Sequence, residues 1–427
     1  MSPPLRALDL FSGIGGLSHA LTGVIRPVAY CDIEEVSQRV LEDAMQKSRI
    51  PRAPICKDVK GLDTKWLRSQ SITRLESVCA GFPCVGFSLA GNREGFDQEG
   101  SGLFREILRI VDEVKSIKYL FLENVGVILR DGMDHLTQEL AAKRGFDLAW
   151  VVTEAREVGA PQRRKRWFCI ATKRGAPPLG PPPPFEMKGY RSHLQRWLHG
   201  EPKHRTLCVG GRADPPMPVQ RNARRRLFLL GNGVVPDQAR HSYLHLMGLL
   251  HERRARAKAV VGGREQQQQQ PTGNLAPAGD SIALRMPPEG RALKRDGNAW
   301  PKCGTVTRVD GKRRVHARPR PTPRHWRAPM PLRLDSALYR PPRGIVAQNV
   351  LEPVGKIALD YWSTPRAGMT HASHAMTRRT MKDLPTQVRH AVDTPGDERR
   401  CGVLDPTWVE WLQGVDRDWT RAATSMK

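Results

Sequence analysis

The stretch Arg6-Ala-Leu-Asp-Leu-Phe-Ser-Gly-Ile-Gly-Gly16 decides the fold of the first part of this chain. Arg6 to Phe11 is an apolar run typical of a buried strand, and the glycine-rich turn from Ser12 to Gly16 ends it. The pattern then predicts a helix over Leu17 to Val24. A strand, a glycine turn and a helix in this order let a nucleotide-like ligand approach the backbone closely, because glycine carries no Cβ.

Short apolar runs alternate with helical patterns up to about residue 171. Further strands are predicted at Pro27–Cys31, Ser77–Ala80, Lys118–Leu122 and Trp167–Ala171. Leu103 to Val114 predicts a helix, because its apolar residues recur every three or four positions. Strands that alternate with helices favour an α/β fold with a doubly wound, mostly parallel sheet.

The charge of the chain is strongly basic and unevenly distributed. Its 427 residues carry a formal net charge of +26. Residues 1–170 hold 24 Lys and Arg against 22 Asp and Glu, whereas residues 171–427 hold 45 against 21. Such a surface attracts a polyanion, most often nucleic acid, although a basic tail without a specific ligand would have the same composition. The hydrophobic fraction of 39% argues against wholesale disorder.

Several classes of protein are disfavoured by composition. The eight cysteines include no C-x-x-C pair and are too sparse for a disulfide scaffold, so we expect reduced thiols. No H-E-x-x-H or paired Cys/His spacing occurs, and we expect no metal. The sequence shows neither a secretory signal pattern nor an apolar run of 18 residues, so we expect an intracellular protein without a membrane anchor.

The sequence divides into four parts. Residues 1–174 and 227–250 are predicted to form the catalytic α/β domain, with Leu227–Leu250 read as a strand, a Gly-Asn-Gly turn and a helix starting near Pro236. Residues 175–226 begin with a proline-rich spacer. Residues 251–298 are read as a basic low-complexity linker, and residues 299–427 as a smaller basic domain.

Polar residues with chemical potential follow several of the predicted strands. Asp32 and Asp58 could accept hydrogen bonds from ribose hydroxyls and an adenine amino group, although each could simply cap a helix. Cys84, after Pro83, could be a nucleophile or a packed small residue. Glu123 ends another strand and places a carboxyl group at the same edge of the sheet.

A basic run, Gly159-Ala-Pro-Gln-Arg-Arg-Lys-Arg166, precedes the strand at Trp167. Alternation along a strand would send Arg164 and Arg166 to one face, and Arg163 and Lys165 to the other. One face could reach the site while the other meets solvent or phosphate. A charge run is usually a solvated face, but this one abuts a buried strand.

Five strings occur in an order that resembles the DNA (cytosine-5)-methyltransferase family: D-L-F-S-G-I-G-G, G-F-P-C-x-x-F-S, E-N-V, Q-x-R-x-R and G-N-G-V-V-P. The resemblance covers residues 5–171 and 229–250. It implies a Rossmann-like, S-adenosylmethionine-dependent methyltransferase that flips a cytosine out of double-stranded DNA. In this reading Cys84 adds to C6 of the base, Glu123 protonates or hydrogen-bonds N3, and Arg164 supports the base carbonyl.

The resemblance also assigns the cofactor and DNA contacts. The positions matched to S-adenosylmethionine binding are Phe11, Gly13, Gly15, Asp32, Asp58, Pro83, Leu103, Asn232 and Val234. The positions assigned to DNA are Ser88, Arg163, Lys165 and Arg166. The expected partner is double-stranded DNA bound by a monomer, without a metal.

Three departures from the family pattern limit the transfer. Val85 stands where many members carry Gln, and Asp32 where many carry Glu. Only residues 172–226 lie where the family usually places target recognition, whereas Leu404–Gly414 is similar to a string near the end of phage-type members. We therefore expect target recognition within 299–427. The alternatives are an RNA cytosine-5 methyltransferase, a DNA-binding protein whose catalytic domain has decayed, and a less favoured NAD-dependent oxidoreductase.

Overall fold

A computed structural model describes residues 3–83, 99–158, 160, 162, 164–179, 208–209, 218–250, 303–309, 312–317 and 403–424. The strands are β1 (Leu5–Leu10), β2 (Ile25–Cys31), β3 (Ile55–Cys56), β4 (Ser77–Gly81), β5 (Tyr119–Asn124), β6 (Phe146–Glu154), β7 (Lys165–Lys173), β8 (Cys208–Val209), β9 (Cys303–Val309), β10 (Lys312–Ala317) and β11 (Val403–Leu404). The helices outside residues 120–160 are α1 (Gly16–Ala20), α2 (Glu35–Gln46), η1 (Val59–Gly61), α3 (Thr64–Ser69), α4 (Glu99–Glu113), α8 (Pro218–Asn232), residues 236–250, α11 (Pro406–Gln413) and η6 (Arg421–Thr424). Between β5 and β7 lie α5 (Ile128–Asp131), α6 (Met133–Leu136), η3 (Thr137–Lys143) and η4 (Ala155–Val158).

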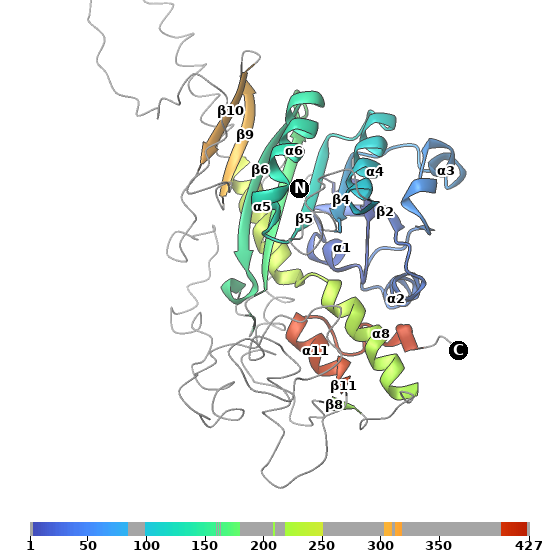
Figure 1. The fold of residues 1–427 in the computed structure, drawn as a ribbon. Coiled ribbons are helices and arrows are strands. Elements are labelled where there is room, and N and C mark those ends of the chain that lie inside the picture. The colour runs from blue at the N-terminus through green and yellow to red at the C-terminus, as the bar shows by residue number, and fades with distance from the viewer. Residues whose placement is uncertain are drawn as a thin grey trace, which may run out of the picture.

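The central sheet has nine strands in the order β10-β9-β6-β7-β5-β4-β1-β2-β3. The pairs β2–β3, β1–β2, β1–β4 and β4–β5 are parallel. Strand β7 lies antiparallel between β5 and β6, so among β1 to β7 it alone runs against the others. The prediction of a doubly wound, mostly parallel α/β sheet is confirmed, and the carboxyl ends of β1 to β5 meet at one edge (Figure 1).

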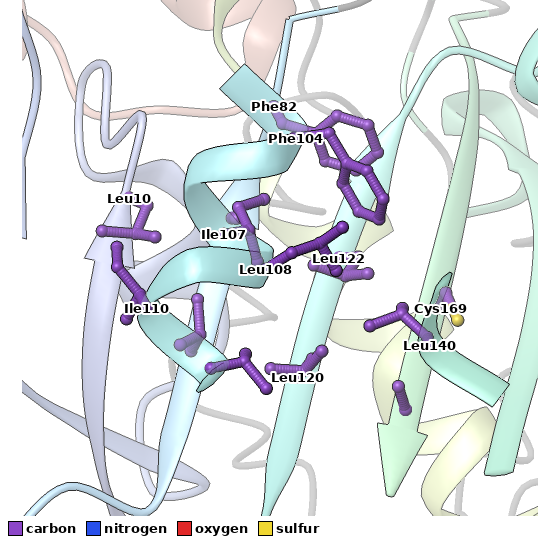
Figure 2. Packing of buried hydrophobic residues seen from close by; sticks show 14 of the residues in the cluster. Leu10, Phe82, Phe104, Ile107, Leu108, Ile110, Leu120, Leu122, Leu140 and Cys169 are labelled. Atoms are coloured by element: carbon purple, nitrogen blue, oxygen red, sulfur yellow. The ribbon is translucent and has the colours of Figure 1, made fainter. Parts of the chain in front are cut away.

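Both faces of the sheet are covered, as the alternation of strand side chains requires. Leu8, Leu10, Leu120 and Leu122 pack on one face, under α4. Figure 2 shows Phe104, Ile107, Leu108 and Ile110 of α4 directed toward these strands. On the other face, Ala7 and Phe121 pack with Leu17 of α1 and Tyr243 of the helix over 236–250. The edge where the carboxyl ends of β1 to β5 meet is therefore held between two apolar layers.

The predicted strands over Arg6–Phe11, Pro27–Cys31, Ser77–Ala80, Lys118–Leu122 and Trp167–Ala171 are confirmed as β1, β2, β4, β5 and β7. The predicted helices of the first half correspond to α1 and α4, and the helix starting near Pro236 is also present. Strands β3 and β6 were not predicted. The two residues of β3 are too short for a periodic signal.

The prediction of a strand at Leu227–Leu230 is wrong. This apolar run lies within α8, which begins at Pro218, inside the part predicted as a spacer. Ala223, Leu227 and Leu230 are buried and follow one another at helical spacing. A short apolar run does not distinguish a buried strand from a buried helix, and here the helical face found partners in α2 and α11.

The described parts of 299–427 do not form a domain of their own. Strand β9 pairs with β6, with Leu148 opposite Val306, and β10 continues the same sheet. Figure 1 shows α11 alongside α8, and Val409 and Leu412 share a buried cluster with Leu230. The Leu404–Gly414 string, expected in a recognition domain, therefore packs against α8.

Residues 251–298, predicted as a linker, lie outside the described residues. In the part of the chain that is described, no helix has the length and apolar character needed to cross a bilayer.

Candidate active site

The glycine turn after β1 forms the first wall of the site. Phe11, Gly13 and Gly15 have positive φ angles of 54°, 54° and 77°. The Ser12 backbone N–H donates to the Cys31 carbonyl at 3.1 Å, which ties the turn to β2. A Cβ built on Gly13 would meet nothing within 4 Å, so open space lies directly over the backbone here. This is the close approach that a nucleotide-like ligand needs.

Asp32, directly after β2, faces this turn. Its Oδ2 accepts from the Gly13 N–H at 2.7 Å and its Oδ1 from the Glu34 N–H at 3.0 Å. Burial raises the pKa of Asp32, and these two backbone hydrogen bonds oppose that shift. The side chain keeps partial exposure, so a carboxylate here remains accessible to hydroxyl donors.

Asp58 follows the neighbouring strand β3. Cys31 and Cys56 are register partners, with Asp32 one residue after Cys31 and Asp58 two residues after Cys56, so the two acids leave the sheet at the same edge. Asp58 is exposed, and its carboxylate accepts from the Lys60 N–H at 2.9 Å, capping η1. Asp58 therefore caps a helical turn, as the alternative to a ligand role predicts. Beside Asp32, Ile33 is 72% exposed, an unusual position for a large apolar side chain. Carboxylates next to exposed apolar surface fit an adenosine group.

Val234 closes the turn from the far side. A Cβ on Gly16 would lie 2.9 Å from Val234 Cγ1, so only glycine permits this approach. Asn232 is exposed at the end of α8. Phe11 and Leu103 are both partly buried against the apolar cluster under α4, whereas Val234 belongs to the cluster on the other face of the sheet. Of the predicted cofactor residues, Phe11, Gly13, Gly15, Asp32 and Val234 thus lie at or against the turn that follows β1.

The second part of the site lies at the ends of β4 and β5. Gly81 is the register partner of Glu123, and a Cβ on Gly81 would lie 3.1 Å from Glu123 Oε2. Pro83 is the last described residue before Cys84. Asn124 donates from Nδ2 to the Phe82 carbonyl at 3.1 Å, which fixes the end of β4. Cys84, Ser88 and Arg163, predicted as nucleophile and DNA contacts, lie outside the described residues, as does the departure at Val85.

Glu123 pairs with Arg166. The Arg166 Nε lies 3.0 Å from Glu123 Oε1, and only 13% to 14% of either side chain is exposed. Burial raises the pKa of Glu123, while the charges of Arg166 and Arg164 act in the opposite direction. A carboxyl group with a raised pKa holds its proton more readily than an exposed glutamate.

Arg164, predicted to support the base carbonyl, contacts the end of α8. Its guanidinium is buried, and Nη2 donates to the carbonyls of Gly231, at 3.0 Å, and of Gly233. Carbonyls in the last turn of a helix lack partners within that helix, and a cation there also favours the helix dipole. Burial lowers the pKa of Arg164. The geometry therefore ties Arg164 to α8 and brings Arg166, expected on DNA, to the acid.

Lys165 points away from this pair. Its side chain is 59% exposed, and Nζ lies 3.2 Å from Glu154 Oε1. The predicted alternation of the basic run is thus seen for Lys165 and Arg166, which leave β7 on different sides. Sequence reasoning missed Asn124 and Gln162 as structural contributors. Gln162 is buried and donates to the Leu412 carbonyl at 2.7 Å, a contact across 250 residues that no local pattern announces.

Residues 5–205 match the family model described as C-5 cytosine-specific DNA methylase. The predicted resemblance to the DNA (cytosine-5)-methyltransferase family is confirmed by this match. The Type II methyltransferase M.CviJI of Paramecium bursaria Chlorella virus IL3A is 27% identical over 438 residues, 97% of each chain. The predicted enzyme class, a DNA cytosine-5 methyltransferase, is confirmed by these matches.

Two bacterial members of the methylase family match over shorter stretches. Type II methyltransferase M.MspI of Moraxella sp is 34% identical over 176 residues, covering 40% of this chain and 39% of that relative. Type II methyltransferase M.HhaI of Haemophilus parahaemolyticus is 29% identical over 204 residues, covering 44% and 56%. The chain therefore aligns with nearly the whole of the viral methyltransferase, but with only part of these bacterial ones.

Proposed function

We propose that this chain transfers a methyl group from S-adenosylmethionine to C5 of a flipped-out cytosine in double-stranded DNA. The observation that carries the proposal is the pairing of a buried glutamate with an arginine at the end of β5, beside the strand that leads to Cys84. S-adenosylmethionine, when bound, supplies an electrophilic methyl group on a positively charged sulfur. The remaining chemistry belongs to the residues of this chain.

The cofactor fits the first wall of the site. Asp32 would accept hydrogen bonds from the ribose hydroxyls. The exposed Ile33 and the partly buried Phe11 would contact the apolar faces of the cofactor. Asp58 would reach the adenine amino group from the neighbouring strand. The turn at Gly13 leaves room for the methionine end, because nothing lies within 4 Å of a Cβ placed there.

Cytosine C5 is a poor nucleophile, so a covalent step must precede methylation. The Cys84 thiolate would add to C6, forming a C–S bond and turning C5 into an enamine-like carbon. Glu123 would give a proton or hydrogen bond to N3 and so stabilise the electron density that addition of the thiolate places on the ring. After methyl transfer, loss of the C5 proton restores the C5–C6 double bond and expels the thiolate.

Arg166 is better placed than Arg164 to support the base carbonyl. It meets Glu123 at 3.0 Å, so a base that hydrogen-bonds Glu123 through N3 would lie within reach of the same guanidinium through O2. Arg164 would act from behind, by fixing the α8 end. This reassigns the base contact from the first to the second arginine of Q-x-R-x-R.

The basic surface would hold the DNA backbone. Lys165 is exposed beside the site, and residues 171–427 carry most of the net positive charge. Contacts to phosphate release counterions, so DNA affinity should fall steeply between low and physiological salt. Target recognition within the undescribed part of 299–427 remains our prediction.

The direct test is covalent trapping on duplex DNA that contains 5-fluorocytosine. Fluorine at C5 cannot leave as a proton does, so the wild-type chain should remain attached to the DNA after methyl transfer, and Cys84→Ser should not. Cys79→Ala, which alters a fully buried thiol of β4, is the matched control and should still be trapped. A matched RNA duplex and labelled cofactor complete the experiment. Label in RNA alone would replace DNA as the substrate, and trapping of Cys84→Ser would refute the nucleophile.

A further inference from the structure

The glycine turn is a strained part of the fold that needs support from outside. Phe11 has a φ of 54°, in the left-handed region that non-glycine residues rarely adopt. Such conformations persist when neighbouring contacts determine them. Asp32 holds the Gly13 N–H at 2.7 Å, and the Ser12 carbonyl accepts from the Gly15 N–H at 2.8 Å. These supports all come from the first 32 residues.

A further support comes from the opposite end of the chain. The indole Nε1–H of Trp419 donates to the Ile14 carbonyl at 2.8 Å, across 405 residues. Trp419 is fully buried. Its ring packs edge-on against His19 at a centroid distance of 5.0 Å, and the Arg49 guanidinium lies 5.0 Å from the ring centroid. The contact is therefore a packed and desolvated one, in which a lost donor would leave a buried carbonyl unpaired.

A buried carboxylate fixes the loop that presents Trp419. Glu410 of α11 is fully buried, and its oxygens accept from the backbone N–H groups of Asp418 and Thr420, each at 2.8 Å. Arg226 of α8 donates to Glu410 at 2.8 Å and to the Thr420 hydroxyl at 2.9 Å. Both residues that flank Trp419 are thus held by one acid, which is neutralised by an arginine on the neighbouring helix.

We propose that Trp419 is a positioning residue for the cofactor site, acting through Ile14 on the turn formed by Phe11 to Gly15. This rests on the proposed function, which assigns Phe11 and Gly13 to S-adenosylmethionine. With Gly13 held by Asp32 and Ile14 by Trp419, adjacent peptide groups of the turn are fixed from two sides. The turn then has the same geometry before and after ligand binding, so little ordering cost opposes cofactor affinity.

The proposal gives the Leu404–Thr420 segment a task. Its glutamate, Glu410, orders the loop, and its tryptophan completes a site whose other parts lie at the start of the sequence. The segment acts on the cofactor side and needs no contact with DNA for this role.

The test compares Trp419→Phe with Trp411→Phe in the full-length chain. Trp411 lies in α11 and is also buried, so its substitution removes the same atoms from the same segment. Binding of S-adenosylhomocysteine is measured by calorimetry. Trp419→Phe should weaken binding about tenfold, the effect of one lost buried hydrogen bond, whereas Trp411→Phe should change it less than about twofold. The kcat at saturating cofactor should stay within about twofold of wild type for Trp419→Phe.

Hydrogen exchange of the peptide over residues 10–20 gives a second measurement. Exchange should be faster in Trp419→Phe and unchanged in Trp411→Phe, at equal melting temperature or after correction for it. Equal affinity and equal exchange in the two variants would overturn the proposal, since Trp419 would then be only a core residue.

A milder variant covers the case in which Trp419→Phe does not fold. Arg49→Met removes the cation over the ring but leaves the indole N–H, and should weaken binding about two- to threefold. Unchanged binding in Arg49→Met would then count against the proposal. Wild-type protein that binds neither S-adenosylmethionine nor S-adenosylhomocysteine would instead refute the proposed function, which separates the two failures.

Discussion

The two ends of the catalytic edge surround their carboxyl groups with different partners, although burial raises the pKa of both Asp32 and Glu123. At the ends of β2 and β3, Asp32 and Asp58 accept hydrogen bonds from backbone N–H groups and keep contact with solvent. At the end of β5, Glu123 is desolvated and faces two guanidinium groups, one of them in direct contact. One fold thus supplies acceptors at one end and a proton-holding acid at the other.

This difference follows from what each end must bind. Hydroxyl and amino groups of a nucleoside are donors, so an ionised and accessible carboxylate serves them best. A ring nitrogen that gains electron density needs a donor, so the acid there must resist ionisation. The parallel strands deliver both acids to one edge, and the partners of each acid, backbone N–H groups at Asp32 and guanidinium groups at Glu123, then separate their chemistry.

The largest effect is expected from Glu123→Gln. The amide keeps the shape but cannot transfer a proton, so kcat should fall about 10²- to 10⁴-fold while the KM for cofactor stays nearly constant. Steady-state methylation of a duplex measures both constants. Glu154→Gln is the matched control, because Glu154 is a buried, ion-paired glutamate at the end of β6. A similar loss of kcat in both variants would remove the distinction we draw for Glu123.

Arg166→Lys should lower activity more than stability, and Arg164→Lys should lower stability more than activity. Arg166→Lys loses the geometry toward Glu123 and the base, so kcat/KM for DNA should fall about 10- to 100-fold with little change in stability. Arg164→Lys leaves one carbonyl at the α8 end without its donor, so the free energy of unfolding should fall by about 1–3 kcal/mol. Urea titration and initial rates measure the two quantities. The opposite assignment of the two effects would restore Arg164 as the base contact.

Much of this site could be predicted from the sequence, because its parts sit at strand ends. The strands β1, β2 and β5 are strongly apolar, and Phe11, Asp32 and Glu123 each lie at or next to the end of one of them. Local patterns also placed the glycine turn. For such residues, the parallel sheet itself converts positions in the sequence into neighbours in space.

The roles of Arg164 and Arg166 could not be predicted in the same way. Their partners depend on where α8 ends, and α8 was read as a strand at Leu227–Leu230. The contact of Trp419 with Ile14 spans 405 residues and has no periodic signal. Long-range side-chain to carbonyl bonds are chosen by tertiary packing, and sequence spacing carries no information about them.

A smaller effect is expected at the cofactor end. Asp32→Asn removes the charge that attracts the ribose hydroxyls, so the KM for S-adenosylmethionine should rise about tenfold with kcat within about twofold. Asp58→Asn should raise that KM only about two- to threefold, because Asp58 is exposed and screened. Rates at several cofactor concentrations distinguish the two. A loss of kcat in Asp32→Asn would mean that the two ends do not act separately.

Asp9 tests whether burial alone sets the difference between the ends. It lies in β1 beside the cofactor turn, yet it is fully buried, and burial raises its pKa to about 7, with a further contribution from the charge of Asp32. Between the lower pKa of Asp9 in the unfolded state and its pKa of about 7 in the folded state, only the folded state keeps the proton on Asp9. Stability from this group is fully present at acidic pH and is lost as the pH rises toward and through 7.

Relative to Asp9→Asn, the wild-type chain should thus lose roughly 1 kcal/mol of unfolding free energy per pH unit between pH 5 and 7. The amide can still accept from the Ser18 hydroxyl, so the difference isolates the charge. Urea titrations of both variants across this range measure it. In the Asp32→Asn background the loss should end at a lower pH and be smaller in total, because the folded-state pKa of Asp9 falls once its acidic neighbour is neutral. A pH-independent difference would show that Asp9 stays charged despite its burial. In that case the hydrogen-bonding and ionic partners of each acid, and not exclusion of water, would be what separates the two ends.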